Sequence, residues 1–341
     1  MSALKVSIVI PTKNEGKYLP RVIDSLLRQD YPQEDLEILI VDGRSTDHTR
    51  DCVEQYRRKY RSIRLIDNPQ FYTVFAFNAG IKHATGDIIF FVGAHTEYSP
   101  NYVSTVVTYI QEGKAECVGS VACTLPGNET LMARSIALVL SSPFGVGNSY
   151  MRTGQKTIRY TDTASCSGYK REVFDKIGLF NEKLIYSQDI EFNLRLRKAG
   201  MRILLVPDIT SYYYARPDLT SFCKHNFRNG LWSILPFKYS PIIPISIRHL
   251  IPLTFVTGLL CSFILSFFST VFLWLFYLIL GSYGAANLFF SGRIVFHTRD
   301  LRYLFMLPVT FACLHLIYGV GSMWGVVKLF QSEPLSGLQS G

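Results

Sequence analysis

Short apolar runs alternate with helical patterns along the N-terminal part of the chain. The first run is Val6 to Ile10 and the second is Glu37 to Val41, and a polar turn follows each of them. After each turn, apolar residues recur at the three- and four-residue spacing that is typical of an amphipathic helix. Ile63 to Ile66 and Ile88 to Val92 continue the series of runs. Strands that alternate with helices in this way predict right-handed crossovers and a mainly parallel α/β sheet.

The run from Ile88 to Val92 has no polar alternation, as expected of a central strand that is covered on both faces. It ends in Gly93-Ala94-His95, and Glu97 follows closely. Open α/β sheets bind ligands beyond the carboxyl ends of their strands, so His95 and Glu97 stand where a site is expected. A second interpretation stays open, in which Gly93 only makes a turn and His95 is a solvated loop residue.

The middle of the chain has a looser pattern. Cys117 to Cys123 resembles a strand, and Leu131 to Leu140 resembles a helix. The loop from Ser141 to Ser149 lacks the Gly-Lys-Ser/Thr ending of a phosphate-binding loop. A later helix is predicted from Tyr186 to Arg197, with Asp189 at its opening, where a carboxylate is favoured. Asp189 either caps this helix or is directed from its rigid end into a cleft.

The C-terminal part of the chain is apolar. The stretch from Leu250 to Gly292 contains no Asp, Glu, Lys or Arg. As one helix it would be about 65 Å long, roughly twice the hydrocarbon core of a bilayer, so we expect two spans with a turn at Ser266 to Thr270. Tyr303 to Val327 is a third uncharged stretch, and its Gly321 and Gly325 form a small-residue pattern that suits close helix contact. The predicted transmembrane helices are therefore about 250–268, 270–290 and 303–327, within residues 249–330.

Basic residues orient these spans. Arg293, Arg299 and Arg302 lie between the second and third spans, so the positive-inside rule places that loop in the cytoplasm. The large N-terminal domain at 1–214 is then cytoplasmic, in a multi-pass protein of the inner cell membrane, and the tail 331–341 lies on the far side. Residues 215–248 mix aromatic and basic side chains, which is typical of an amphipathic interfacial segment.

Composition narrows the class of partner. The net charge is +9 and 48% of residues are hydrophobic. The basic residues are interleaved with acids and form no aromatic-basic repeat, so we expect no nucleic acid and favour an anionic membrane surface or phosphorylated substrates. The seven cysteines include no CxxC pair, which argues against a disulfide framework and a zinc site. The start of the chain lacks the features of a signal peptide. Nothing in the sequence indicates an oligomeric state.

Five motifs in the chain are Pro11-Thr-Lys-Asn-Glu15, Asp42-Gly-Arg-Ser-Thr-Asp-His-Thr49, Asn78-Ala-Gly80, Gly86-Asp87 and Gln188-Asp189. Together they resemble the family-2 inverting glycosyltransferases, which have the GT-A fold, a Rossmann-like sheet with flanking helices. Four further segments resemble the succinoglycan-type membrane-associated glucosyltransferases: Gly93 to Tyr98, Ser142 to Asn148, Arg248-His249 and His315 to Gly321. This similarity covers nearly the whole chain.

The resemblance implies a set of site residues. Asp189 matches the catalytic carboxylate, which takes the proton from the acceptor hydroxyl. The remaining positions are nucleotide-binding (Pro11, Thr12, Asn14, Glu15, Asp42, Gly93), acceptor- or donor-sugar-binding (Gly168, Tyr169, Gln188) and phosphate-binding (Lys13, Arg152, Arg228).

One motif departs from the family. The family has Asp-x-Asp at the end of the fourth strand, where the last Asp binds Mg²⁺ or Mn²⁺, and this sequence has Gly93-Ala94-His95. His95 therefore falls on the metal-binding position, and imidazole suits Mn²⁺ better than Mg²⁺. His95 alternatively contacts phosphate or acceptor directly, or is a bystander.

The resemblance implies transfer of a hexose from a nucleotide diphosphate sugar, a uridine one, to a lipid-linked acceptor in polysaccharide or glycolipid synthesis. A simpler lipid acceptor, polyprenyl phosphate or diacylglycerol, is the first alternative. A non-catalytic scaffold that binds nucleotide sugar within an assembly complex is the second, which the missing Asp at position 93 makes conceivable and the intact Gln188-Asp189 disfavours.

Overall fold

The computed structural model describes residues 4–240, 242 and 247–331. The chain forms two compact units, which we call the sheet unit (Met1–Cys123 and Tyr150–Tyr214) and the helical unit (Thr124–Ser149 and Ala215–Gly341). The end of the predicted interfacial segment at 243–246 and the predicted far-side tail from 332 lie outside the described residues.

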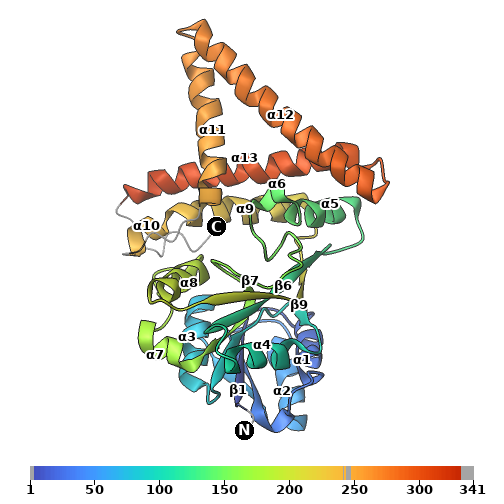
Figure 1. Cartoon of the computed structure of the whole chain (residues 1–341), viewed down its shortest axis with the longest axis vertical. Helices are drawn as coiled ribbons and strands as arrows, with labels where there is room; N and C mark the ends of the chain where they lie inside the picture. The colour runs from blue at the N-terminus through green and yellow to red at the C-terminus, as the bar shows by residue number, and fades with distance from the viewer. Residues whose placement is uncertain (1–3, 241, 243–246, 332–341) are drawn as a thin grey trace. The chain divides into compact units, whose positions relative to one another are not determined.

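The sheet unit alternates strands and helices in its first half, as the sequence predicts (Figure 1). Its elements are β1 (Val6–Thr12), α1 (Leu19–Leu27), a 3-10 helix (Gln33–Asp35), β2 (Leu36–Asp42), α2 (Thr49–Lys59), β3 (Ile63–Asp67), α3 (Thr73–His83), β4 (Ile88–Phe91), β5 (Thr96–Tyr98), α4 (Tyr102–Gln111), β6 (Cys117–Leu125), β7 (Arg159–Tyr160), β8 (Ser165–Lys170), α7 (Arg171–Ile177), α8 (Gln188–Lys198) and β9 (Ile203–Tyr214).

The strands form one mixed sheet in the order β3-β2-β1-β4-β8-β6-β9-β5, with β7 paired to β9. β1, β2, β3 and β4 pair in parallel. Antiparallel pairs join β8 to β4 and to β6, and β5 and β7 to β9. The predicted parallel arrangement thus holds for the first four strands, whereas the later strands are antiparallel. The apolar pattern of a strand fixes which of its faces are buried, not the direction of its neighbours.

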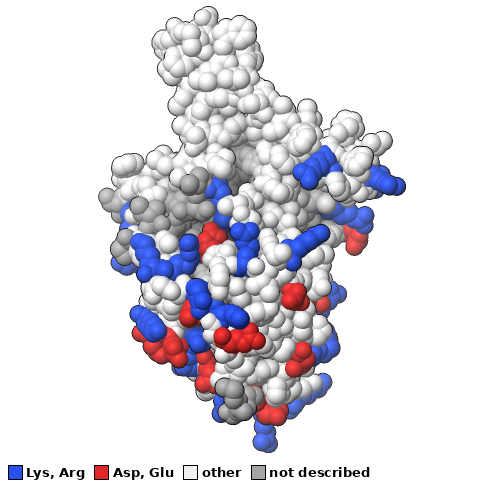
Figure 2. All heavy atoms as spheres, in the orientation of Figure 1, with Lys and Arg blue, Asp and Glu red and all other residues white. Residues whose placement is uncertain are grey.

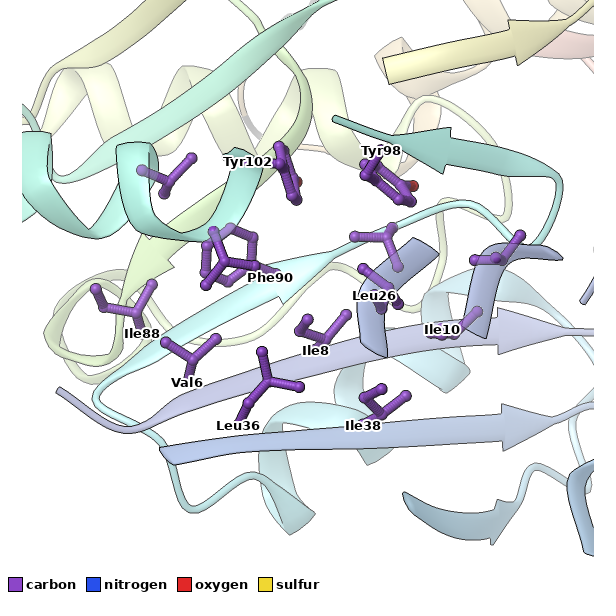
Figure 3. Packing of buried hydrophobic residues seen from close by; sticks show 14 of the residues in the cluster. Val6, Ile8, Ile10, Leu26, Leu36, Ile38, Ile88, Phe90, Tyr98 and Tyr102 are labelled. Carbon is purple, nitrogen blue, oxygen red and sulfur yellow. The ribbon is translucent and has the colours of Figure 1, made fainter. Parts of the chain in front are cut away.

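The central strands are apolar on both faces because helices cover both. Figure 3 shows Ile8 and Ile10 of β1 packed near Leu26 of α1 on one face. On the other face, Val9 lies against α3, where a Cβ on Gly80 would overlap its side chain. This close approach explains the glycine of the Asn78-Ala-Gly80 motif.

Asn78 has a structural role as well. Its side-chain amide donates to the carbonyl of Phe180 at 3.0 Å and its Oδ1 accepts from the Phe180 N–H at 3.0 Å. The side chain thereby ties α3 to the segment that leads into α8, the helix that carries Asp189.

The helical unit consists of α5 (Leu131–Leu140), α6 (Pro143–Val146), α9 (Leu219–Ile234), α10 (Pro236–Tyr239), α11 (Ile247–Leu265), α12 (Thr270–Thr298) and α13 (Tyr303–Leu329). The last three are long and apolar enough to cross a membrane, and α11 and α12 meet at the predicted turn. Helix α12 runs beyond the predicted residue 290 to Thr298, because a helical backbone does not end where its apolar stretch ends.

Residues 124–149 pack with the helical unit, although the sequence analysis grouped them with 1–214. Oγ1 of Thr310 lies 3.9 Å from the sulfur of Met132, and a ring nitrogen of His315 lies 2.9 Å from the carbonyl oxygen of Phe144. The apolar face of α5 finds its partner on α13, far along the chain, which a local pattern does not reveal.

Candidate active site

A cavity of about 480 Å³ opens in the sheet unit beyond the carboxyl ends of β1 and β4. It brings together nine residues that the sequence analysis assigned to a site: Pro11, Thr12, Lys13, Glu15, Gly93, His95, Arg152, Tyr169 and Asp189. They come from segments spread over most of the unit. This is expected of a site at the point where the strand order of a sheet reverses, because loops from distant segments meet there.

Asp189 reaches the cavity from the first turn of α8. Ser187, the residue just before α8, has a left-handed backbone (φ 59°), a conformation uncommon for a residue with a side chain. The Asp189 side chain is open to the cavity. Surrounding protein atoms nevertheless displace water from the carboxylate, and this desolvation raises the pKa of Asp189. The rise is opposed by the N–H groups of Ile190 and Asp189 and by the Arg152 guanidinium. A carboxylate with a raised pKa is a stronger base, which suits the predicted general-base role of Asp189; that role stays a prediction.

Tyr169 forms the floor beside Asp189. Burial raises the pKa of its phenol well above the usual range, so the hydroxyl stays protonated, and it donates to Oδ1 of Asn193 at 3.0 Å. The neighbouring Gly168 does not line the cavity, because it is packed against Phe90 and Val106 with no room for a Cβ. This packing accounts for a glycine at position 168, and the contact of Gly168 with a sugar stays a prediction.

His95 and Glu15 face each other across the ends of β4 and β1. Nδ1 of His95 lies 3.4 Å from Oε1 of Glu15, and both residues line the cavity. Among the described residues, no group of three or more His, Cys, Asp or Glu side chains gathers to hold a metal ion. The protein therefore offers one nitrogen and one carboxylate here, and a bound metal would need further ligands from substrate or water.

Asn14 and Asp42 are engaged in a loop network. Asp42 is fully buried, and its carboxylate accepts from the Ser45 hydroxyl at 2.5 Å and from Nε of Arg50 at 2.5 Å. Oδ1 of Asn14 accepts from the Thr46 N–H at 2.8 Å. In this arrangement both side chains hold residues 43–50, which are the turn after β2 and the start of α2 and which we call the 43–50 loop, and neither lines the cavity. Their direct contact to a nucleotide stays a prediction.

Of the three predicted phosphate ligands, two line the cavity and one does not. Lys13 and Arg152 line the cavity, with the guanidinium of Arg152 5.1 Å from the ring centre of Tyr213. Arg228 lies on α9, in the helical unit. Gln188 also does not line the cavity, and its buried Oε1 has no hydrogen-bond partner within the described part of the chain.

Sequence reasoning missed the wall that follows β3. Asn68, Phe71 and Tyr72 line the cavity there. Asn68 directly follows the carboxyl end of a parallel strand, so the rule that pointed to His95 also points to it. Phe71 gives no such signal, since an exposed aromatic residue in a loop has no pattern.

Comparisons with known proteins agree with this geometry. Residues 7–178 match the model of "Glycosyl transferase family 2". A dolichyl N-acetyl-alpha-D-glucosaminyl phosphate 3-beta-D-2,3-diacetamido-2,3-dideoxy-beta-D-glucuronosyltransferase from Methanococcus voltae is 30% identical over 331 residues, 95% of this chain and 97% of that protein. Succinoglycan biosynthesis protein ExoA from Rhizobium meliloti is 27% identical over 252 residues, 69% of this chain and 75% of that protein.

Among solved structures, the mannosyltransferase PcManGT from Pyrobaculum calidifontis, in complex with GDP-Man and Mn²⁺, has a TM-score of 0.60 at 17% identity. The match covers 95% of this chain and 88% of that one and supports the shared fold. The fold and the family match together define a glycosyltransferase with a GT-A-like sheet. The chain belongs to glycosyl transferase family 2, which confirms the resemblance seen in its motifs.

Proposed function

We propose that the sheet unit transfers a hexose from a uridine diphosphate sugar to a lipid-linked acceptor, with inversion at the anomeric carbon. The observation that carries this proposal is the placement of Asp189 in one cavity with Lys13, Arg152 and His95. A carboxylate with a raised pKa, in the same cavity as two cations, suits a single displacement in which an acceptor hydroxyl attacks and a diphosphate leaves.

Each group then has a chemical role. Asp189 accepts the proton of the attacking hydroxyl. Lys13 and Arg152 stabilise the negative charge that develops on the leaving diphosphate. Tyr169 and Asn193, linked by their hydrogen bond, form a fixed polar wall for sugar hydroxyls.

Acceptor and donor classes are drawn from the similar proteins. The Methanococcus voltae relative is named for a dolichyl-phosphate-linked sugar acceptor. A crystal structure of S. aureus TarS 1-349 in complex with UDP-GlcNAc has a TM-score of 0.52 over 95% of this chain. The apolar helices α11, α12 and α13 would keep the enzyme at the membrane where lipid-linked acceptors reside. We place the sheet unit on the cytoplasmic face of the inner membrane, where nucleotide sugars are made.

His95 and Glu15 would hold a divalent cation that also binds the donor diphosphate, whose oxygens supply the ligands that the protein lacks. The nitrogen and carboxylate donors, 3.4 Å apart, fit Mn²⁺ better than Mg²⁺. When bound, the cation neutralises leaving-group charge.

His95→Ala is expected to raise the Mn²⁺ concentration for half-maximal activity by about tenfold or more, since loss of even an outer-shell partner typically costs about 10- to 100-fold in metal affinity. His95→Asp should shift the preference toward Mg²⁺. Metal titrations of activity and of UDP binding by calorimetry measure both effects. His83→Ala, an exposed histidine on α3, is the control. Unchanged metal curves with a raised KM would instead indicate direct contact of His95 with a substrate.

We propose that Phe71 packs against the nucleobase of the donor. It lines the cavity with 43% of its surface exposed, although a large apolar side chain gains by burial. Its backbone is left-handed, with φ 67°, a strained conformation for an aromatic residue. Nζ of Lys13 lies 4.8 Å from the ring centre, so the ring stands beside a phosphate-binding group. Strain and exposure together support a ligand-binding role for this side chain.

Phe71→Gly is expected to weaken UDP binding by about tenfold, because base–aromatic stacking contributes about 1–3 kcal/mol. The same change should leave the melting temperature unchanged or raise it, since glycine adopts a positive φ without strain. Calorimetry and thermal denaturation test the pair of effects. Phe71→Tyr should bind UDP as tightly as the wild type does. Phe71→Gly should bind pyrophosphate with unchanged affinity, because pyrophosphate has no base. Equal UDP affinity of the wild type and Phe71→Gly would remove Phe71 from the donor site.

A donor panel tests the nucleotide assignment. UDP, GDP, CDP and ADP are titrated against the full chain in detergent with Mn²⁺ present. The proposal predicts that UDP binds tightest and that Arg152→Ala weakens its binding. Tighter binding of GDP would change the proposed donor from a uridine to a guanosine diphosphate sugar and would not affect the proposed transfer reaction.

A further inference from the structure

Helix α13 has different neighbours from α11 and α12, although all three are apolar. Within the helical unit α13 lies beside α9 and crosswise to α11 (Figure 1). A Cβ on Gly321 would overlap the Phe227 carbonyl, and one on Gly230 would overlap the Tyr318 carbonyl. The Ser233 and Ser322 hydroxyls are 3.3 Å apart. The Gly321 pattern therefore does mediate close helix contact, and its partner is α9.

The covered face of α13 extends along most of the helix. Near its start Thr310 contacts Met132 of α5, and at its end Nζ of Lys238 donates to the Gln331 carbonyl at 2.6 Å. Between these points α6 and α9 lie against it. By contrast, α11 meets α13 at a crossing, where Gly319 packs against Pro252 and Val256.

The helices that cover α13 carry charges. Lys224 and Arg228 lie on α9, Arg134 lies on α5, and Lys238 lies on α10. If α13 crossed a bilayer, α9 would be drawn into the hydrocarbon core beside it, and both Lys224 and Arg228 would leave water. Cations at that depth are strongly disfavoured unless they face a bundle interior or a water-filled cavity.

The opposite face of α13 is a single apolar stripe. Its exposed members recur at three-, four- and seven-residue spacing, as positions on one side of a helix do. They are Phe305, Val309, Leu316, Val320, Trp324 and Val327, and two further exposed apolar residues, Leu304 and Val326, flank the stripe. Nζ of Lys328 lies 5.5 Å from the ring centre of Trp324, an aromatic–basic pair of the kind found at membrane–water interfaces. An apolar stripe with charged neighbours behind it is the pattern of a helix that lies in the plane of the interface.

We infer that the chain crosses the membrane only as the α11–α12 hairpin, and that α13 lies in the headgroup–acyl boundary of one leaflet, paired with α9. The stripe faces the acyl chains and the charged helices face the headgroups. The hairpin tip is suited to the bilayer, since Phe267, Phe268 and Trp274 are exposed and no charged atoms are visible there (Figure 2). Two crossings return the residues after α13 to the side of α9. This inference does not depend on the reaction catalysed.

Reporter fusions in a bacterial host test the number of crossings. Alkaline phosphatase is active only after export, whereas green fluorescent protein exported unfolded stays dark. We expect a phosphatase fusion truncated after Phe268, at the hairpin tip, to be active. After Gly341 of the full chain, we expect fluorescence and no phosphatase activity. A dark fluorescent fusion with an active phosphatase fusion after Gly341 would show three crossings and overturn the inference.

Matched lysine variants test the depth of α13. Leu316→Lys, in the middle of the stripe, should leave the carbonate-resistant membrane fraction unchanged, because a lysine near the interface extends its ammonium to the headgroups. Leu278→Lys, on the exposed surface of α12, should reduce that fraction. If Leu316→Lys causes an equal loss, α13 lies at the depth of α12 and the inference is wrong.

Discussion

Asp189→Asn is expected to lower turnover by about 10²- to 10⁴-fold, the usual contribution of a positioned general base. Asparagine has nearly the shape of aspartate and is tolerated in the first turn of a helix, so α8 and the cavity should persist. UDP affinity and melting temperature should therefore match those of the wild type. Rates with saturating donor and acceptor, measured beside calorimetry, separate the loss of chemistry from the loss of binding.

Asp175→Asn is the control for Asp189→Asn. Asp175 is an exposed carboxylate on α7, close to α8 in the chain. The variant Asp175→Asn should keep full turnover. Near-normal turnover of Asp189→Asn would assign the general base to another residue. Glu15, the other cavity carboxylate, would then be examined through Glu15→Gln.

The pH dependence of kcat is an independent test of Asp189 as the general base. Surrounding protein atoms raise the pKa of Asp189 above the ordinary aspartate value of 3.8. The base is active only when deprotonated, so kcat should fall as the pH drops through this raised pKa, and full activity should be reached above it. The residual rate of Asp189→Asn should lack this acidic limb. An acidic limb that persists unchanged in the variant would belong to another group.

Asp42→Ala is expected to weaken UDP binding by about 1.5–3 kcal/mol, roughly 10- to 150-fold, if the carboxylate accepts a hydrogen bond from the donor. In the structure this carboxylate is bound to Ser45 and Arg50, so the donor would have to exchange with one of them. Calorimetry gives the affinity, and thermal denaturation reports the separate cost of opening the 43–50 loop.

Arg50→Ala is the matched control for Asp42→Ala. It removes the Asp42–Arg50 ion pair but leaves the carboxylate and its bond to Ser45. If Asp42 binds the nucleotide, Asp42→Ala should weaken UDP binding more than Arg50→Ala does. Equal losses in the two variants would reduce Asp42 to a residue that holds the loop.

Local patterns predicted the first half of the sheet well. The apolar runs of β1, β2 and β4 are buried on both faces, so their composition alone distinguishes them from surface strands. The position of His95 followed from the rule that α/β sheets bind ligands beyond their strand ends. Asp189 at the start of α8 was recognised from its motif. The other residues that line its cavity come from distant segments, and no single motif contains them.

Contacts between distant segments were not predictable in the same way. The sequence does not show that Asp42 pairs with Arg50 or that α5 belongs with α13, since both depend on chain segments meeting in the fold. Nor does a run of apolar residues distinguish α13 from α11 and α12. The difference lies in the charged helix beside it, which the local pattern of α13 cannot contain.

The most direct test of the central claim is transfer itself. Full-length protein in detergent is incubated with labelled nucleotide sugars, Mn²⁺ and lipids extracted from the organism that encodes it, and the labelled lipid is identified by mass spectrometry. We predict that a sugar from one uridine donor appears on a lipid-linked saccharide, and that Asp189→Asn forms hardly any product. Label on polyprenyl phosphate or diacylglycerol would change the acceptor class. No labelled lipid with any donor, from protein that binds UDP normally, would contradict the account and indicate a nucleotide-sugar-binding scaffold.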